Sequence, residues 1–134
     1  MSGQGKSNFT CSEEFKKRAK IFALRVIKLY QSLPNNVEAQ ILGKQLLRAA
    51  TSVAANYRAA CRARSSAEFV SKIGIVLEES DESLFWLEVL EEAGIVPAKR
   101  LTQLKQEANE LTAILTTIRK SSQKKKQLSN SQTL

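Results

Sequence analysis

Residues 46–86 read LLRAATSVAANYRAACRARSSAEFVSKIGIVLEESDESLFW, and this stretch decides the fold. Its first half is rich in Ala and carries only cations, whereas its second half carries mostly anions. The double Ser65-Ser66 separates the halves, because Ser caps a helix better than it continues one. The cations are Arg48, Arg58, Arg62 and Arg64, and the anions that follow are Glu78, Glu79, Asp81, Glu82 and Glu88. We therefore predict two antiparallel helices of complementary charge.

The same spacing of apolar residues extends in both directions from this stretch. Apolar side chains recur in alternating steps of three and four residues, which is typical of a helix that buries one stripe. This pattern predicts four helices, one ending near Leu33 and the others at about 37–63, 66–93 and 97–120. Because the connections are short, we predict an all-α, up-down-up-down antiparallel four-helix bundle. In the two central helices the predicted core positions are Leu42, Leu46, Ala49, Val53, Asn56, Ala60 and Ala63, then Phe69, Ile73, Val76, Ser80, Ser83, Leu87 and Leu90.

Helix ends are marked by capping residues. Thr10 with Glu13, and Ser65 with Glu68, have the spacing of capping boxes. Gly94 suits the end of the third helix, and Pro97 suits the first turn of the fourth. We predict a flexible N-terminal arm at residues 1–9, a bundle domain at 10–120, and a disordered basic tail at 121–134, since the tail lacks apolar periodicity.

The residue types needed for common catalytic and metal sites are scarce. The sequence contains no His, which removes the Glu-x-x-His pairs of bundle metal sites and the Ser-His or Cys-His nucleophiles. Cys11 and Cys61 form no CxxC motif, so we predict reduced thiols, with Cys61 buried and inert, and a cytoplasmic setting. No apolar run is long enough to cross a membrane. We expect a protein that is not an enzyme and has no cofactor or metal.

Net charge provides the main functional indication. The chain carries a net charge of +8, and the acidic residues concentrate in residues 65–94. A surplus of this size attracts polyanions, above all nucleic acid, and binding would be to the backbone because no base-reading motif is present. The candidate nucleic-acid-binding residues are Arg48, Arg58, Arg62 and Arg64, with Lys16, Lys17 and Lys20 on the first helix.

Two alternatives to this interpretation remain open. Arg48, Arg58 and Arg62 could instead pair with Glu78, Glu79 and Glu82 on the third helix, which would set helix order rather than bind a ligand. The lysines of the first helix could form an ordinary solvated face. In that case the protein would be a protein-only adaptor or structural oligomer.

The third helix carries more apolar surface than one core can absorb. Leu84 to Leu90 surround most of its circumference. We therefore predict that Phe85, Trp86 and Val89 form an oligomer interface, since large exposed apolar patches are uncommon on monomers. Asn56 stands at an apolar position, where it could fix register or bond to a backbone group, Ser80 or Ser83.

The sequence also resembles a known family. The runs LLRAATSVAANYRAACRARS (46–65), EFVSKIGIVLEESDESLFWLEVLEEAGI (68–95), FALRVIKLY (22–30) and Leu33-Pro34 resemble the bacterial four-helix bundle proteins encoded within intervening sequences of large-subunit ribosomal RNA genes. The resemblance covers about residues 13–118 and is most specific at 48–64 and 78–86.

This resemblance implies a homopentameric ring of four-helix bundles. It also implies a relative, the accessory variability determinant protein of diversity-generating retroelements, which is a basic pentamer that binds nucleic acid and a reverse transcriptase. The family brings no catalytic residues. A basic binding surface carries over only to Arg48, Arg58, Arg62 and Arg64, which lie in the matching motif. We therefore expect a nucleic-acid-binding accessory scaffold that partners RNA or DNA and, by resemblance, a reverse transcriptase.

Overall fold

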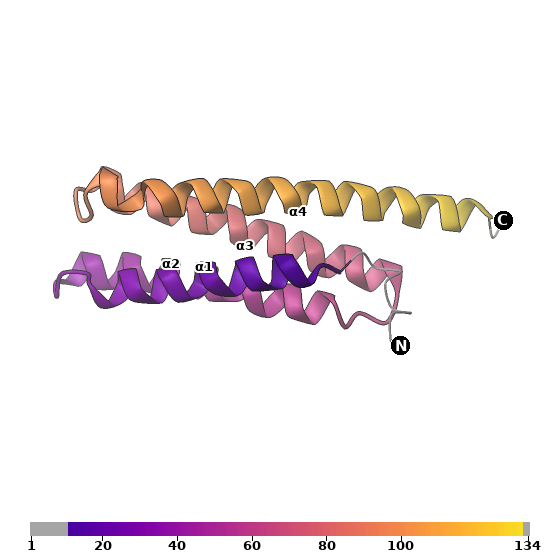
Figure 1. Cartoon of the computed structure of the whole chain (residues 1–134), viewed down its shortest axis with the longest axis horizontal. Helices are drawn as coiled ribbons and strands as arrows, with labels where there is room; N and C mark the ends of the chain where they lie inside the picture. The colour runs from indigo at the N-terminus through magenta and orange to yellow at the C-terminus, as the bar shows by residue number, and fades with distance from the viewer. Residues whose placement is uncertain (1–10, 133–134) are drawn as a thin grey trace.

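Four antiparallel helices form the molecule in the computed structural model, which describes residues 11–132 without the side chains of 126 and 129–132. They are α1 (Glu13–Gln31), α2 (Val37–Ala60), α3 (Ser66–Glu92) and α4 (Ala98–Gln132). The α1–α2 and α3–α4 connections lie at one end of the bundle and the α2–α3 connection at the other (Figure 1). Helices α1 and α3 occupy diagonal corners, because each packs against both α2 and α4. The predicted up-down-up-down four-helix bundle is confirmed.

The core follows the predicted spacing, with one correction on α2. Every predicted position of α3, from Phe69 to Leu90, is buried. On α2 the buried side chain is Tyr57, whereas the neighbouring Asn56 is half-buried and donates to the Ser52 carbonyl at 2.9 Å. Ser80 bonds to Thr112 instead, with 2.8 Å between the hydroxyls. The assignment of Asn56 to the core was wrong. Both Ala49–Val53–Asn56 and Ala50–Val53–Tyr57 follow steps of three and four residues, and the second series buries the tyrosine ring.

The start of α1 is fastened to the end of α2. Ser12 caps α1 by accepting from the Phe15 N–H at 3.0 Å, and its own N–H donates to the Tyr57 hydroxyl at 2.9 Å. The Tyr57 ring lies 4.5 Å from the Phe15 ring. The predicted cap Thr10 and the predicted arm at residues 1–9 lie outside the described residues. Burial raises the pKa of Tyr57, so its hydroxyl stays protonated.

Cys11 and Cys61 form a disulfide, and the prediction of reduced thiols was wrong. The two residues are 50 apart in sequence, but the antiparallel pairing of α1 and α2 places their Cα atoms 5.4 Å apart. That separation is normal for a disulfide. The disulfide removes the part of the argument for a cytoplasmic setting that rested on reduced cysteines, and that setting stays a prediction.

The later helix ends follow the capping signals, except at the C-terminus. Ser65 accepts from the Glu68 N–H at 3.1 Å, and Gly94 follows α3 with a φ of 74°. Helix α4 continues through Gln132 and projects beyond the other helices (Figure 1), so the prediction of a disordered tail was wrong for 121–132. The segment after Pro97 contains no Gly or Pro to end the helix, and Ser122 is buried. Residues 133–134 lie outside the described part.

Candidate nucleic-acid interface

Arg48 is engaged within the bundle. Its guanidinium donates to Glu79 at 3.1 Å and also to Glu82, which accepts a further hydrogen bond from the Trp86 indole at 2.9 Å. The bond to Glu82, with a smaller contribution from Glu79, raises the pKa of Arg48. The indole and then the guanidinium lower the pKa of Glu82. The predicted pairing of α2 with α3 is therefore present at Arg48.

The other arginines of the matched motif point to solvent. Arg58 and Arg62 are exposed and, among the described residues, form no ion pair. Arg64 approaches Glu68 only to 3.9 Å, and its side chain is 91% exposed. The alternative in which Arg58 and Arg62 pair with the acidic residues of α3 was therefore wrong. These three guanidinium groups are available to a ligand.

Some cations of α1 are exposed, and others are paired with carboxylates. Lys17 and Lys20 are exposed without an ion pair among the described residues, while Lys16 pairs with Glu13 at 2.9 Å. Arg18, which the sequence analysis did not single out, joins α1 to α4. It donates to Glu107 at 2.7 and 3.0 Å and to Glu110 at 2.8 Å.

These bonds raise the pKa of Arg18, the one to Glu107 most strongly. They also lower the pKa of Glu110, on which Gln106 acts too. The contact joins charged side chains of α1 and α4, so the spacing of apolar residues in the sequence did not indicate it.

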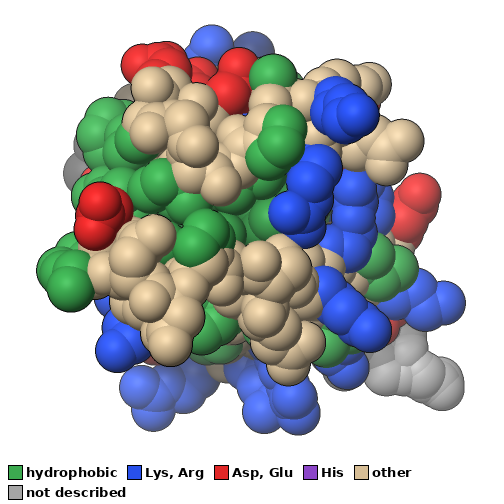
Figure 2. Space-filling model, turned by 90° about the vertical axis from the view of Figure 1, so that its left-hand side faces the viewer, with side chains coloured by type: hydrophobic (Ala, Val, Ile, Leu, Met, Phe, Trp, Pro, Cys, Tyr) green, Lys and Arg blue, Asp and Glu red, His purple; other side chains and the backbone are tan. Residues whose placement is uncertain are grey.

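A basic cleft lies between the end of α1 and the start of α4. It has a volume of about 490 Å³, and four cations line it, Arg25 and Lys28 from α1 and Lys99 and Arg100 from α4. No carboxylate belongs to its lining. Figure 2 shows the end of the molecule with the α1–α2 and α3–α4 connections, where Lys and Arg side chains gather along one side. We call this hollow the α1–α4 cleft.

Sequence reasoning missed the α1–α4 cleft, because its two pairs of cations are about 70 residues apart. The signal was the absence of acidic residues in the first turn of α4. That turn normally favours anions, since the backbone N–H groups at a helix start carry a partial positive charge.

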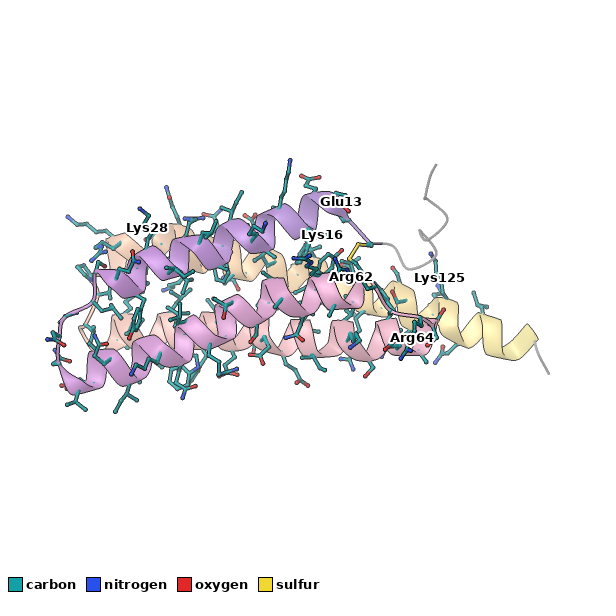
Figure 3. All side chains as sticks on the ribbon, turned by 90° about the horizontal axis from the view of Figure 1, so that it is seen from below. Glu13, Lys16, Lys28, Arg62, Arg64 and Lys125 are labelled. Atoms are coloured by element: carbon teal, nitrogen blue, oxygen red, sulfur yellow. A yellow bond between two sulfur atoms is a disulfide. The ribbon has the colours of Figure 1, made fainter. Side chains whose placement is uncertain are left out.

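Unpaired cations therefore occur at both ends of the bundle. In Figure 3, Lys28, which lines the α1–α4 cleft, lies toward one end of the bundle, and Arg62, Arg64 and Lys125 lie toward the opposite end, with Arg62 near the disulfide. The C-terminal turns of α4 add Lys120 and Lys124, which are also exposed. In the part of the chain that the structure describes, most acidic residues without an ion pair lie on α3: Glu78, Asp81, Glu88 and Glu92. The cations without an ion pair among the described residues thus lie mainly on α1, α2 and α4, whereas the corresponding acidic residues lie mainly on α3.

The predicted oligomer residues lie on the acidic side. Phe85 is 51% exposed and packs edge-on against Trp86, with the ring centroids 4.9 Å apart. Trp86 and Val89 are half-buried. Further large apolar side chains that the sequence analysis did not name are exposed on α1 and at the start of α2: Ile21, Leu24, Val37 and Ile41.

Within residues 11–132, no helix is both long and apolar enough to cross a membrane. The same residues hold no cluster of three or more His, Cys, Asp or Glu side chains suited to a metal ion.

The fold and the charge distribution define a small helical-bundle protein with a segregated basic surface. The chain belongs to the 23S rRNA-intervening sequence protein family, whose family model matches residues 13–117. It is also similar to the crystal structure of a protein of unknown function from the S23 ribosomal protein family of Bacteroides thetaiotaomicron. The two are 33% identical, the match covers 79% of this chain and 98% of that one, and the TM-score is 0.74. No curated protein matches the chain.

Proposed function

We propose that this protein is a non-enzymatic oligomeric scaffold that binds nucleic acid through the phosphate backbone, with little sequence preference. The observation that carries the proposal is the surplus of exposed cations without a carboxylate partner. The ion pairs of the described residues engage only Lys16, Arg18, Arg48, Arg64 and Lys105. The other cations of the described part are exposed or half-buried, four of them in the lining of the α1–α4 cleft, and phosphodiesters are suitable counterions for them.

The resemblance to the accessory variability determinant protein supports the accessory role. Under this proposal the chain assembles into a pentamer through Phe85, Trp86 and Val89 and partners a reverse transcriptase. The exposed Phe85 ring supports a subunit contact on α3, because an aromatic ring gains most from leaving water. Repeating a modest basic patch around a ring would strengthen binding by avidity.

A salt titration tests the nucleic-acid part of the proposal. Fluorescence anisotropy with a labelled single-stranded RNA and a DNA duplex should show affinity that falls linearly with salt on a log–log plot. Replacing Arg58 and Arg62 together by Gln should lower the slope by about 1.4 for the single strand and about 1.8 for the duplex.

The matched control is the pair Arg58→Lys and Arg62→Lys, which keeps the charge. This control should retain most of the affinity, because backbone binding responds to charge more than to guanidinium geometry. The absence of binding at low salt would refute the proposal. In that case the protein-only adaptor is the better account, and it predicts that the charge reversals Arg58→Glu and Arg62→Glu disrupt subunit assembly.

A further inference from the structure

We propose that the α1–α4 cleft is a binding site for a triphosphate group. The site is distinct from the exposed arginines at the opposite end of the bundle. It does not rest on the nucleic-acid proposal, because a free triphosphate can bind here whether or not the protein binds RNA or DNA.

Charge is the first argument. Arg25, Lys28, Lys99 and Arg100 converge on one hollow from two helices, and none of them forms an ion pair among the described residues. The nearest acidic residues of α4, Glu107 and Glu110, are already bound to Arg18. A triphosphate carries about four negative charges in a small volume, so it matches this cluster more closely than a single phosphodiester does.

Preorganisation is the second argument. One Arg100 nitrogen donates to the Ser32 hydroxyl at 2.8 Å, and that hydroxyl donates to the Leu29 carbonyl at 2.7 Å. This chain of bonds joins the first turn of α4 to the end of α1. A guanidinium has five N–H donors, so Arg100 is oriented by one of them and keeps others for phosphate oxygens.

The start of α4 adds to the positive potential. Helix α4 begins at Ala98, and its first turn contains Lys99 and Arg100 but no acidic residue. The partial positive charge of the helix start is therefore not neutralised by its own side chains. The Gln103 side chain, one turn further on, also lines the cleft and offers an amide donor.

The size of the cleft sets the class of ligand. Its volume of about 490 Å³ falls in the range of small-molecule sites. The body of a nucleic-acid duplex is too wide for such a hollow, and a backbone that crosses its mouth brings only one charge per phosphate. A terminal triphosphate is narrow enough to enter the cleft and brings all of its charges on one group. Two sources share this chemistry, a free nucleoside triphosphate and the 5′ end of an unprocessed transcript.

Calorimetric titration of the full chain with sodium tripolyphosphate tests the site. We expect one ligand to bind per chain. The double substitution Lys99→Gln with Arg100→Gln should weaken binding by at least about tenfold, because each change removes a charge-assisted hydrogen bond.

The matched control is Lys44→Gln with Lys120→Gln, which removes the same charge from exposed positions outside the cleft and outside the candidate nucleic-acid-binding residues. The control should change affinity by less than about twofold. Circular dichroism should show the same helix content in all three proteins, since the substituted side chains are exposed. Failure of tripolyphosphate to bind would overturn the proposal, and so would equal weakening in the control.

Competition against bound tripolyphosphate separates the two sources. Displacement by GTP or ATP at matching stoichiometry would support a free nucleotide. Displacement by an RNA oligonucleotide with a 5′-triphosphate, but not by the same RNA with a 5′-hydroxyl, would support recognition of transcript ends. If the 5′-hydroxyl RNA competes as well as the triphosphorylated one, or if neither nucleotide nor RNA competes, the proposal is wrong.

Discussion

Breaking the Cys11–Cys61 disulfide should destabilise the protein substantially. The bond joins residues 50 apart, at the open end of the α1–α2 hairpin. The chain-entropy relation for a loop of that length gives about 4 kcal/mol at 25 °C. Measured effects are often smaller, so we expect a loss of about 2–4 kcal/mol in the free energy of unfolding.

The folded state should survive this loss, because other contacts hold the start of α1 in place. The Phe15 and Tyr57 rings remain packed, and the Ser12 N–H still donates to the Tyr57 hydroxyl. The destabilisation should therefore come from the unfolded state, whose conformational entropy rises when the disulfide no longer constrains it. Urea unfolding should show a lower midpoint together with a higher m-value, since the reduced unfolded chain exposes more surface.

Three samples make this measurement decisive: the oxidised protein, the same protein with reductant, and a Cys11→Ser, Cys61→Ser variant. The variant should match the reduced protein and should not respond to reductant. Equal midpoints for the oxidised and reduced proteins would refute the entropy argument. Two thiols reacting with a thiol reagent in the native, unreduced protein would refute the bond itself.

Four further substitutions give predictions about stability that can be checked by chemical denaturation. Gly43→Ala should destabilise despite a gain of about 1 kcal/mol in helix propensity, because the new Cβ would lie 2.4 Å from a Leu33 methyl and 3.0 Å from a tyrosine ring. Gly74→Ala should instead stabilise by about 1 kcal/mol, since its new Cβ meets nothing closer than 3.6 Å; opposite signs for the two glycines are the outcome to look for. Tyr57→Phe should cost about 1 kcal/mol, because a backbone N–H loses its acceptor, and an unchanged midpoint would contradict that bond. The lowered pKa of Glu82 stabilises the fold above the ordinary carboxyl pKa, and this contribution disappears as the pH falls through the lowered value. Glu82→Gln should therefore lose less stability between pH 7 and pH 3 than the parent protein does, by under about 1 kcal/mol for so exposed a group.

The architecture could be read from the sequence because helix spacing is a local property. The apolar steps from Phe69 to Leu90 predicted the buried face of α3 correctly, and Ser65 and Gly94 marked its two ends. Where two alternations fit equally well, the pattern could not choose. Asn56 and Tyr57 are neighbours, and only packing against α1 shows that the ring turns inward.

Features that depend on two segments far apart in the chain could not be predicted from the sequence. The disulfide needed the antiparallel pairing of α1 and α2 to bring Cys11 to Cys61. The α1–α4 cleft needed the corresponding pairing of α1 and α4. Among the arginines of the matched motif, only the structure shows that Arg48 is engaged by carboxylates while Arg58 and Arg62 are not.

The charge separation between α3 and the rest of the bundle bears on how assembly and ligand binding would coexist. The exposed Phe85 ring lies on the helix that carries the unpaired acidic residues, among them Asp81 and Glu88. Under the proposed function, a polyanion would be repelled from that surface and drawn to the cations of α1 and α4, with α1 at the opposite corner of the bundle. A subunit contact through Phe85 would therefore cover acidic surface and leave the cations of α1 uncovered. Each added subunit would then extend the basic surface instead of consuming it, which is the arrangement that binding by avidity requires.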